Sequence, residues 1–163
     1  MNPQGRWSAN NGEYLLEINS DAWQLLEAEC AEANGRETGG ILIGYYSDDY
    51  STAVITEVTL PPKDSTSGAN WFVRGVTGLR TLLVRRWQNA SRRTYYLGEW
   101  HYHPVNHIIP SDDDIKQMKE ISHRPEYQCK EPIMLVIGNK LNASIQFRVF
   151  VFPDGRQTYE YHQ

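Results

Sequence analysis

Two histidines and an aspartate in this sequence have the types and spacing of metal ligands. His101 and His103 are separated by one residue, and Asp114 follows as the last of three consecutive aspartates. If residues 95–103 form a strand, the side chains at 101 and 103 leave the same face, so both imidazoles can reach one point. Two histidines and one carboxylate leave a fourth tetrahedral position for water, which distinguishes catalytic zinc from a closed structural site. The pattern therefore predicts an open zinc site.

The segment after the histidines has to bring Asp114 to them. Pro104 ends the strand because it has no N–H to donate to a ladder. Ser111 can cap a helix over residues 112–122, which places Asp114 in the first turn. On a 3.6-residue period, Asp114 shares the apolar face that contains Met118, whereas the two preceding aspartates point elsewhere and suit a helix N-terminus. An unpaired carboxylate on that inward face is costly, so we predict that Asp114 binds a cation.

A catalytic zinc site usually also has a carboxylate that takes a proton from water and passes it to the leaving group. Glu37 is one candidate because Gly39 and Gly40 follow it and allow another backbone or a substrate to approach closely. By position alone, Glu37 could also be an exposed residue at a helix-to-strand corner. Glu99 is a rival because, on an unbroken pleat, it shares a strand face with both histidines. We predict that Glu37 is the base and that Glu99 orients one of the histidines.

The order and spacing of these elements resemble the JAMM motif of the catalytic MPN, or JAB-domain, zinc metallopeptidases. The shared elements are a glutamate before a Gly-rich apolar strand, then HxHP, then SxxD, with ten residues between the second His and the Asp. The resemblance implies one Zn²⁺ ion per chain, bound by His101, His103 and Asp114. It further implies that Glu37 is the acid/base and that Ser111 stabilises the oxyanion. A plain helix N-cap would occupy the same Ser111 hydroxyl, so both of its roles stay open.

The resemblance spans residues 12–152 and includes one departure. Tyr102 stands between the two histidines, where the family usually has Ser or Thr. On strand alternation Tyr102 faces away from the metal, so we expect altered packing and an intact site. The phrase Gly98-Glu99-Trp100-His101 is most similar to the small bacterial branch of the family. That branch includes the stand-alone JAB deubiquitinase-like peptidases of CBASS antiphage operons.

The implied function is that of a zinc-dependent isopeptidase that cleaves the bond after the C-terminus of ubiquitin or a ubiquitin-like modifier. It would act in deconjugation or precursor processing during antiphage defence, and the conjugated protein could be a nucleotidyltransferase of the same operon. An extended modifier tail needs a narrow groove, entered by pairing with an exposed strand edge. We expect the loop at residues 61–70 and the apolar pair Ile108-Ile109 to flank this groove.

Other functions stay open at this point. The same site could hydrolyse a small amide or the precursor of a sulfur carrier. A non-catalytic MPN scaffold would only bind partners, although every motif ligand is present. A DNA-linked role, suggested by RadC-like proteins with a similar HxHP pattern, is disfavoured by the acidic charge of the chain. Deaminase chemistry is disfavoured because no PCxxC pair accompanies the histidines.

Composition narrows the class of protein. With 163 residues, of which 40% are hydrophobic, the chain can bury a sizeable core in one domain, which we place at residues 12–163 after a polar tail at 1–11. The net charge of −4 argues against nucleic acid as a partner. Cys30 and Cys129 are too few for a disulfide framework, which fits a reducing cytoplasm. No apolar run is long enough to span a membrane. The sequence leaves the oligomeric state open.

Strands and helices alternate along the chain, which predicts an α/β layered domain. The resemblance sharpens this to the cytidine-deaminase-like three-layer architecture, a central mixed sheet flanked by helices. Trp100 is predicted to lie in the core, and His107, His123 and His162 to be ordinary polar side chains. Helices are expected near residues 20–33, 76–87 and 112–122, a turn at 138–140, and strands at 14–18, 38–46, 53–60, 71–74, 95–103, 132–137 and 145–152, with a possible edge at 158–161.

Overall fold

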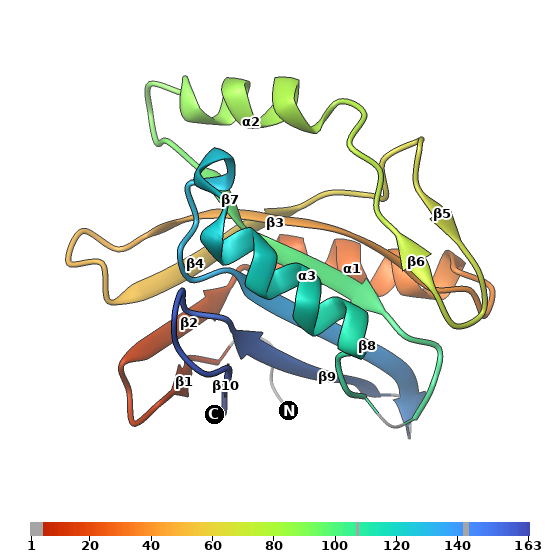
Figure 1. Cartoon of the computed structure of the whole chain (residues 1–163). Coiled ribbons are helices and arrows are strands. Elements are labelled where there is room, and N and C mark those ends of the chain that lie inside the picture. The colour runs from red at the N-terminus through yellow and green to blue at the C-terminus, as the bar shows by residue number, and fades with distance from the viewer. Residues whose placement is uncertain (1–4, 107, 142–143) are drawn as a thin grey trace.

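In the computed structural model, which describes residues 5–106, 108–141 and 144–163, eight strands form one sheet with helices on both of its faces (Figure 1). The order in the sheet is β1-β2-β4-β3-β7-β8-β9-β10. The strands are β1 (Trp7–Ala9), β2 (Tyr14–Ile18), β3 (Thr38–Tyr46), β4 (Thr52–Val58), β7 (Tyr95–Tyr102), β8 (Ile133–Leu141), β9 (Ser144–Val151) and β10 (Tyr159–Glu160). A separate hairpin pairs β5 (Thr66–Ser67) with β6 (Phe72–Val73), and the helices are α1 (Ser20–Glu32), α2 (Leu79–Trp87) and α3 (Asp112–His123), with a short 3₁₀ turn at Pro125–Tyr127.

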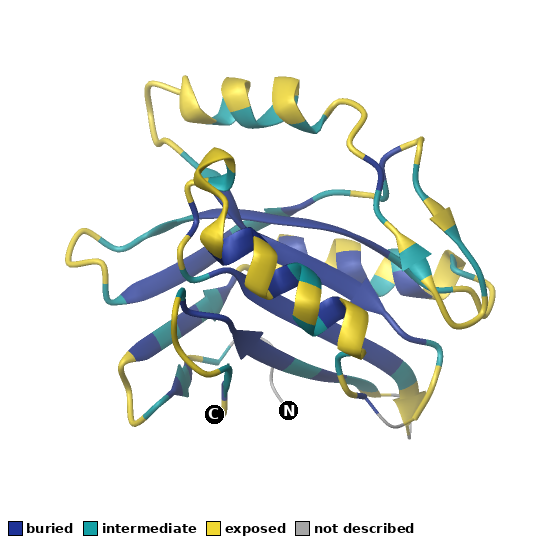
Figure 2. Ribbon diagram, viewed as in Figure 1, coloured by how far each residue is buried: buried dark blue, intermediate teal, exposed yellow. Residues whose placement is uncertain are grey.

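The sheet is mixed, as predicted, because β2 pairs with β4 and β7 with β8 in parallel while the other neighbours are antiparallel. Helix α1 covers one face, and α2 and α3 lie on the other (Figure 1). Two apolar cores result. Trp23 and Leu26 of α1 belong to the first core, and Met118 and Ile121 of α3 belong to the second. Figure 2 shows the buried sheet between its exposed helix surfaces. The predicted three-layer α/β fold is therefore confirmed.

The two ends of the sheet meet. Ser8 of β1 and His162, just beyond β10, exchange two backbone hydrogen bonds of 2.8 Å each. The structure differs here from the polar tail that we expected at residues 1–11. Trp7 and Ala9 alternate with Ser8 and turn inward, and the Trp7 ring packs against Phe147 with centroids 5.1 Å apart. We propose that the domain begins before Trp7.

Two further elements depart from the expected pattern. The turn predicted at residues 138–140 is wrong, because β8 continues through it and Lys140 pairs with Ile145 after a register irregularity. Helix α2 begins at Leu79, so that Val76 lies outside it. Val76 and Trp87, the two ends of the expected helix, are 68% and 49% exposed. The leucines of α2 make its contact with the core, as partly buried side chains at positions 79, 82 and 83.

Several side chains behave as the sequence predicts. Trp100 is fully buried, and its indole N–H donates to the Thr59 carbonyl. Cys30 and Cys129 are buried free thiols. His123 lies at the surface beside Asp154, whereas His107 is outside the described residues. Within the described part of the chain, no helix combines the length and apolar character needed to cross a membrane.

Candidate metal-binding active site

Strand β7 supplies the two histidines from a locally irregular backbone. The pairing of β3 with β7 shifts between Leu42, opposite Gly98, and Ile43, opposite Tyr96, which leaves a bulge at Leu97. Gly98 has a φ of 157°, and a Cβ there would lie 1.8 Å from the carbonyl oxygen of Ile133. Glycine is therefore required at this position. Because the bulge adds one residue, Tyr96 comes onto the same face as the strand positions that point toward α3.

The predicted ligands lie together where β7 ends and α3 begins. Nδ1 of His101 is 2.8 Å from one Asp114 oxygen, and Nε2 of His103 is 3.4 Å from the other. One ligand atom from each of the three residues lies within 4.8 Å of the other two. Tetrahedral zinc bonds of about 2.0–2.1 Å place ligand atoms about 3.3 Å apart, so a small adjustment would close this group around one ion.

The donor set fits a divalent cation. All three side chains are buried, and Nε2 of His101 is one of two buried side-chain polar atoms in the described structure that lack a hydrogen-bond partner. Burial opposes the charged form of Asp114, but hydrogen bonds from His101 and Ser111 prevail and hold its pKa at about 2. Burial lowers the pKa of His103. The carboxylate is thus ionised and one imidazole tends toward its neutral form, which are the states that bind metal.

Ser111 caps α3 through a reciprocal pair of hydrogen bonds. Its hydroxyl oxygen accepts from the Asp114 amide at 3.1 Å, and its own amide donates to the Asp114 carboxylate at 2.8 Å. This capping box restrains the side-chain conformation of the predicted ligand Asp114. The cap uses a lone pair of the hydroxyl, whose proton remains able to donate. The capping role is therefore observed, and it is compatible with an oxyanion role, which stays a prediction.

The register of β3 against β7 places Glu37 near the predicted ligands His101, His103 and Asp114. Gly39 pairs with His101 and Thr38 with Tyr102, so the chain just before β3 runs beside His103. Glu37 lies two residues before Gly39, so its side chain points to the same face of the sheet as His101. It is half-buried. Burial, and then repulsion by Asp114, raise the pKa of Glu37, while attraction by His101 opposes the rise. The structure therefore brings this distant glutamate into electrostatic contact with two of the predicted ligands.

Glu99 lies on the predicted face, but its carboxylate is already engaged. The side chain is 0% exposed and accepts two hydrogen bonds from the guanidinium of Arg74, at 2.6 and 3.0 Å. The Tyr96 hydroxyl donates to the same carboxylate at 2.8 Å. Its observed partners are thus an arginine and a tyrosine. This occupancy favours Glu37 over Glu99 as the base.

The remaining predicted positions fall on different sides of the sheet. Tyr102 faces α1, as expected, and its hydroxyl donates to Asn139. Ile108 is 8% exposed and lies against Gly138, whereas Ile109 is 47% exposed. Of the two proposed groove residues, only Ile109 is free to contact a substrate.

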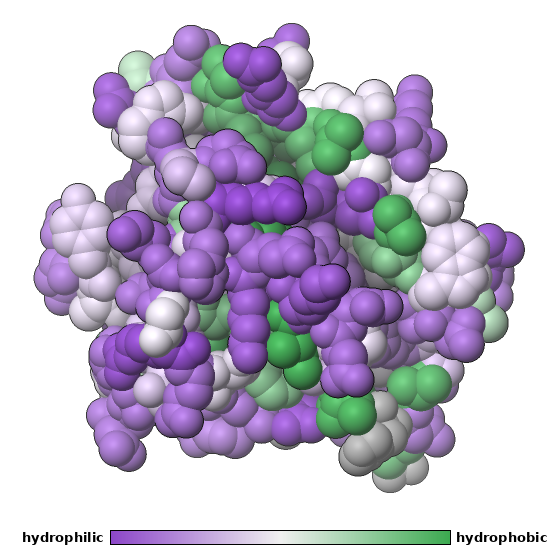
Figure 3. All heavy atoms as spheres, in the orientation of Figure 1, coloured by the Kyte–Doolittle hydropathy of each residue, from purple (hydrophilic) through white to green (hydrophobic). Residues whose placement is uncertain are grey.

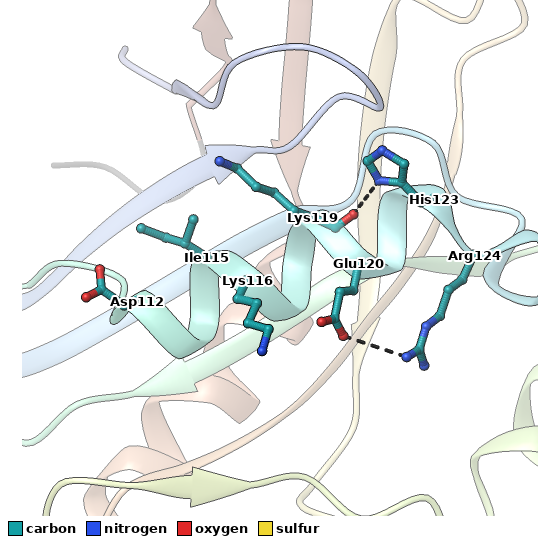
Figure 4. Close-up of a pocket in the computed structure, with 7 residues that line it drawn as sticks. All are labelled: Asp112, Ile115, Lys116, Lys119, Glu120, His123 and Arg124. Carbon is teal, nitrogen blue, oxygen red and sulfur yellow. Dashed lines mark hydrogen bonds and ion pairs between the residues drawn. The ribbon is translucent and has the colours of Figure 1, made fainter.

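A separate hollow on the surface does not involve these residues. It has a volume of about 580 Å³ and follows the outer face of α3 (Figure 4). Its lining comes from that one helix and the residue after it: Asp112, Ile115, Lys116, Lys119, Glu120, His123 and Arg124. None of His101, His103 and Asp114 lines this hollow, so it is separate from the predicted metal site.

Sequence reasoning missed Arg74 and Phe72. The Phe72 ring stands edge-on to the His101 imidazole, with centroids 5.4 Å apart and an interplanar angle of 83°. A signal for Arg74 was present, because residues 65–98 contain six arginines and no acidic residue. An arginine of that segment that becomes buried must find its carboxylate elsewhere in the chain, as Arg74 does in Glu99.

Comparisons with known proteins bear on this fold and site. The model of the family described as prokaryotic homologs of the JAB domain matches residues 20–150. The CD-NTase/cGAS isopeptidase of Enterobacter hormaechei subsp. hoffmannii (strain UCI 50) is 43% identical over 149 residues, which cover 91% of this chain and 81% of that protein. The "Probable metalloprotease y4qB" of Sinorhizobium fredii is 28% identical over 124 residues, covering 76% of this chain and 75% of that protein.

A solved structure adds evidence on the fold alone. The solution structure of a protein from Desulfitobacterium hafniense matches with a TM-score of 0.59 at 16% identity, covering 89% of this chain and 88% of that one. The predicted fold and the predicted family resemblance are both confirmed. The chain belongs to the family of prokaryotic homologs of the JAB domain.

Proposed function

We propose that this protein is a zinc-dependent isopeptidase that cleaves the amide bond after the C-terminus of a ubiquitin-like modifier. The observation that carries the proposal is the buried His101, His103 and Asp114 group with Glu37 beside it. A Zn²⁺ ion held by the three ligands would lower the pKa of a bound water and polarise the scissile carbonyl. With that zinc ion and water bound, these four residues would supply the metal ligands and the base that amide hydrolysis requires.

The protein residues divide the remaining work. The Glu37 carboxylate accepts the proton of the attacking water and then delivers it to the leaving amine. Its raised pKa suits both steps, because a carboxyl nearer to neutral pH holds and releases a proton more readily. The Ser111 hydroxyl, fixed by its cap, donates to the oxygen on which negative charge develops. Burial of the three ligands excludes competing water.

The names of relatives support the substrate class. Proteins of Enterobacter hormaechei, Pseudomonas aeruginosa and Escherichia coli, 43%, 25% and 33% identical to this chain, are named CD-NTase/cGAS isopeptidases. The chain covers 81% of the first of these proteins. We infer that the substrate here is a ubiquitin-like protein joined to a nucleotidyltransferase, in antiphage defence.

A modifier tail has few strand edges available near the site. The main sheet joins its ends at Ser8 and His162, whereas β5 and β6 pair only with each other among the described residues. We therefore place strand addition at the β5–β6 hairpin. In Figure 3 the molecular face above α3 is largely polar, with apolar groups near α2 and the hairpin.

The function is tested with fusions of ubiquitin-like proteins to a C-terminal reporter. We expect zinc-loaded protein to release the intact modifier, a chelator to stop the release, and added zinc to restore it. Precursors of sulfur carriers and small amides are assayed in parallel. Turnover of those compounds with no cleavage of any modifier fusion would contradict the isopeptidase assignment.

Replacing Ile109 with serine is expected to raise KM on the fusion about 10-fold with little change in kcat. Loss of one large apolar contact weakens binding by about 1–3 kcal/mol without touching the reacting atoms. Leu141→Ser, at a residue of similar exposure (45% against 47%), is the matched control. Steady-state kinetics decide: an unchanged KM in Ile109→Ser would remove this residue from the groove.

A further inference from the structure

The hairpin formed by β5 and β6 touches both halves of the candidate active site. Its tip reaches Glu37, whose amide N–H donates to the Gly68 carbonyl at 2.8 Å. The neighbouring Arg36 side chain donates to the carbonyl of Ser67. Its second strand places Phe72 edge-on against the imidazole of His101. One short element therefore bridges the candidate base and a predicted metal ligand.

The hairpin fits closely on the sheet at the same place. A Cβ added to Gly39 would lie 2.7 Å from the Phe72 ring, 2.9 Å from Cδ2 of His101 and 2.4 Å from the Trp100 carbonyl. Gly39 thus leaves the space that the ring fills. Displacement of the hairpin would open a void beside His101 and remove the hydrogen bond on the Glu37 backbone.

The root of the hairpin is anchored by a buried ion pair. Arg74 directly follows β6, and its side chain is 5% exposed. Its guanidinium meets both oxygens of Glu99 and also donates to the Gly75 carbonyl at 2.8 Å. Tyr96, placed on this face by the bulge in β7, completes the set by donating to Glu99. The pair joins the hairpin to the strand that holds the histidines, two residues before His101.

Local hydrogen bonds close the same root. The Asp64 carboxylate accepts from the amides of Val76 and Thr77 at 2.9 Å each, and the Gly75 amide donates to the Ser65 hydroxyl at 2.9 Å. These hydrogen bonds join residues of the same loop and do not reach β7. Only the Arg74–Glu99 pair connects this root to β7 among the side-chain hydrogen bonds of the described residues.

We propose that Arg74 and Glu99 are a positioning pair: by clamping the root of the β5–β6 hairpin to β7, they hold its tip on the Glu37 backbone and so fix the base relative to the metal ligands. The inference rests on the proposed function. Glu99 thus positions Glu37 through the hairpin. Arg74 acts in the reaction only by holding the hairpin in place. Misplacing a base by about 1 Å can reduce a rate by about 100-fold.

The test removes the pair without leaving a buried charge. In the double variant Arg74→Met/Glu99→Gln, both side chains keep similar volume and neither is charged, which avoids the penalty of an unpaired ion. The control is Arg86→Met/Glu57→Gln, which removes a more exposed two-pronged pair, with contacts of 2.6 and 2.9 Å, that joins α2 to β4. Arg74→Lys, which keeps the charge and loses the fork, provides a milder variant.

We expect zinc-loaded Arg74→Met/Glu99→Gln to retain its metal and to lose about 30-fold in kcat on the modifier fusion, with KM changed less than 3-fold. Arg74→Lys should lose less, and the Arg86 control should keep wild-type kcat. Hydrogen exchange at the Glu37 amide should accelerate at least 10-fold in the double variant, and this readout does not depend on activity. If the double variant fails to fold, kcat and exchange at the Glu37 amide are measured in Arg74→Lys instead.

Wild-type kcat in either folded, zinc-loaded Arg74 variant would overturn the proposal, as would unchanged exchange at Glu37. Equal loss in the Arg86 control would also overturn it, because the effect would then reflect general destabilisation. If the wild-type protein cleaves no fusion, the proposed function fails, while exchange at the Glu37 amide still reports whether the pair holds the hairpin.

Discussion

Glu37→Gln is expected to lower kcat on the modifier fusion by about 10²–10⁴-fold while zinc content and Tm stay at wild-type values. Glutamine is nearly isosteric and keeps the backbone bond to Gly68, but it cannot accept the proton of the attacking water. Zinc content is measured by elemental analysis and kcat by steady-state kinetics. Glu32→Gln, at the exposed end of α1, is the matched control and should be silent.

The same residue should set the acid limb of the pH profile. The pKa of Glu37 is raised by burial and by Asp114, so its carboxylate is present above that raised pKa and is lost as pH falls through it. Wild-type kcat/KM of the zinc-loaded enzyme should therefore fall on the acid side as the Glu37 carboxylate is protonated. A Glu37→Gln enzyme with full activity, beside an inactive but folded and zinc-loaded Glu99→Gln enzyme, would make Glu99 the base.

Asp114→Asn is expected to reduce zinc affinity by more than about 100-fold and to abolish activity. Removing a group that only orients a ligand costs about 10–100-fold, and Asp114 is the predicted charged ligand itself. The amide oxygen can still accept from the Ser111 backbone, so α3 should keep its cap and the protein its fold.

Asp113→Asn supplies the control for that change. Asp113 is the preceding residue of the same helical turn, but its side chain is exposed and lies outside the metal group. It should retain zinc and activity. Competition with a chromophoric chelator measures the affinities. An equal loss of zinc affinity in the two variants would show that helix charge, and not coordination, explains the role of Asp114.

The clustering of His101, His103 and Asp114 could be predicted because its determinants are local. Strand alternation brings His101 and His103 to one side, and the 3.6-residue period separates Asp114 from its two neighbours. Glu37 is different, because its position depends on the pairing of Gly39 with His101 across more than sixty residues of sequence. Periodicity cannot supply that register, and only the motif resemblance pointed to it.

The elements that sequence analysis missed are short or irregular. Strands β5 and β6 have two residues each, too few for an alternation pattern, and lie in a segment whose composition indicates a loop. The bulge at Leu97 adds a residue within an otherwise regular strand, so no fixed period could place Tyr96 beside Glu99. The partnership of Arg74 with Glu99 depends on both features, and it emerged only from the structure.

The meeting of Ser8 with His162 constrains how this chain can reach its folded state. These residues belong to opposite ends of the described chain, so the pairing between them is the most distant in sequence within the sheet. The parallel pairs β2–β4 and β7–β8 also require long connections, because the chain must return to the end of the sheet where the first strand began. Such non-local pairing slows folding and leaves strand edges uncovered until a late step. The seam pairs the outward-facing backbone groups of Ser8, which would otherwise be open to strand addition by a neighbouring molecule.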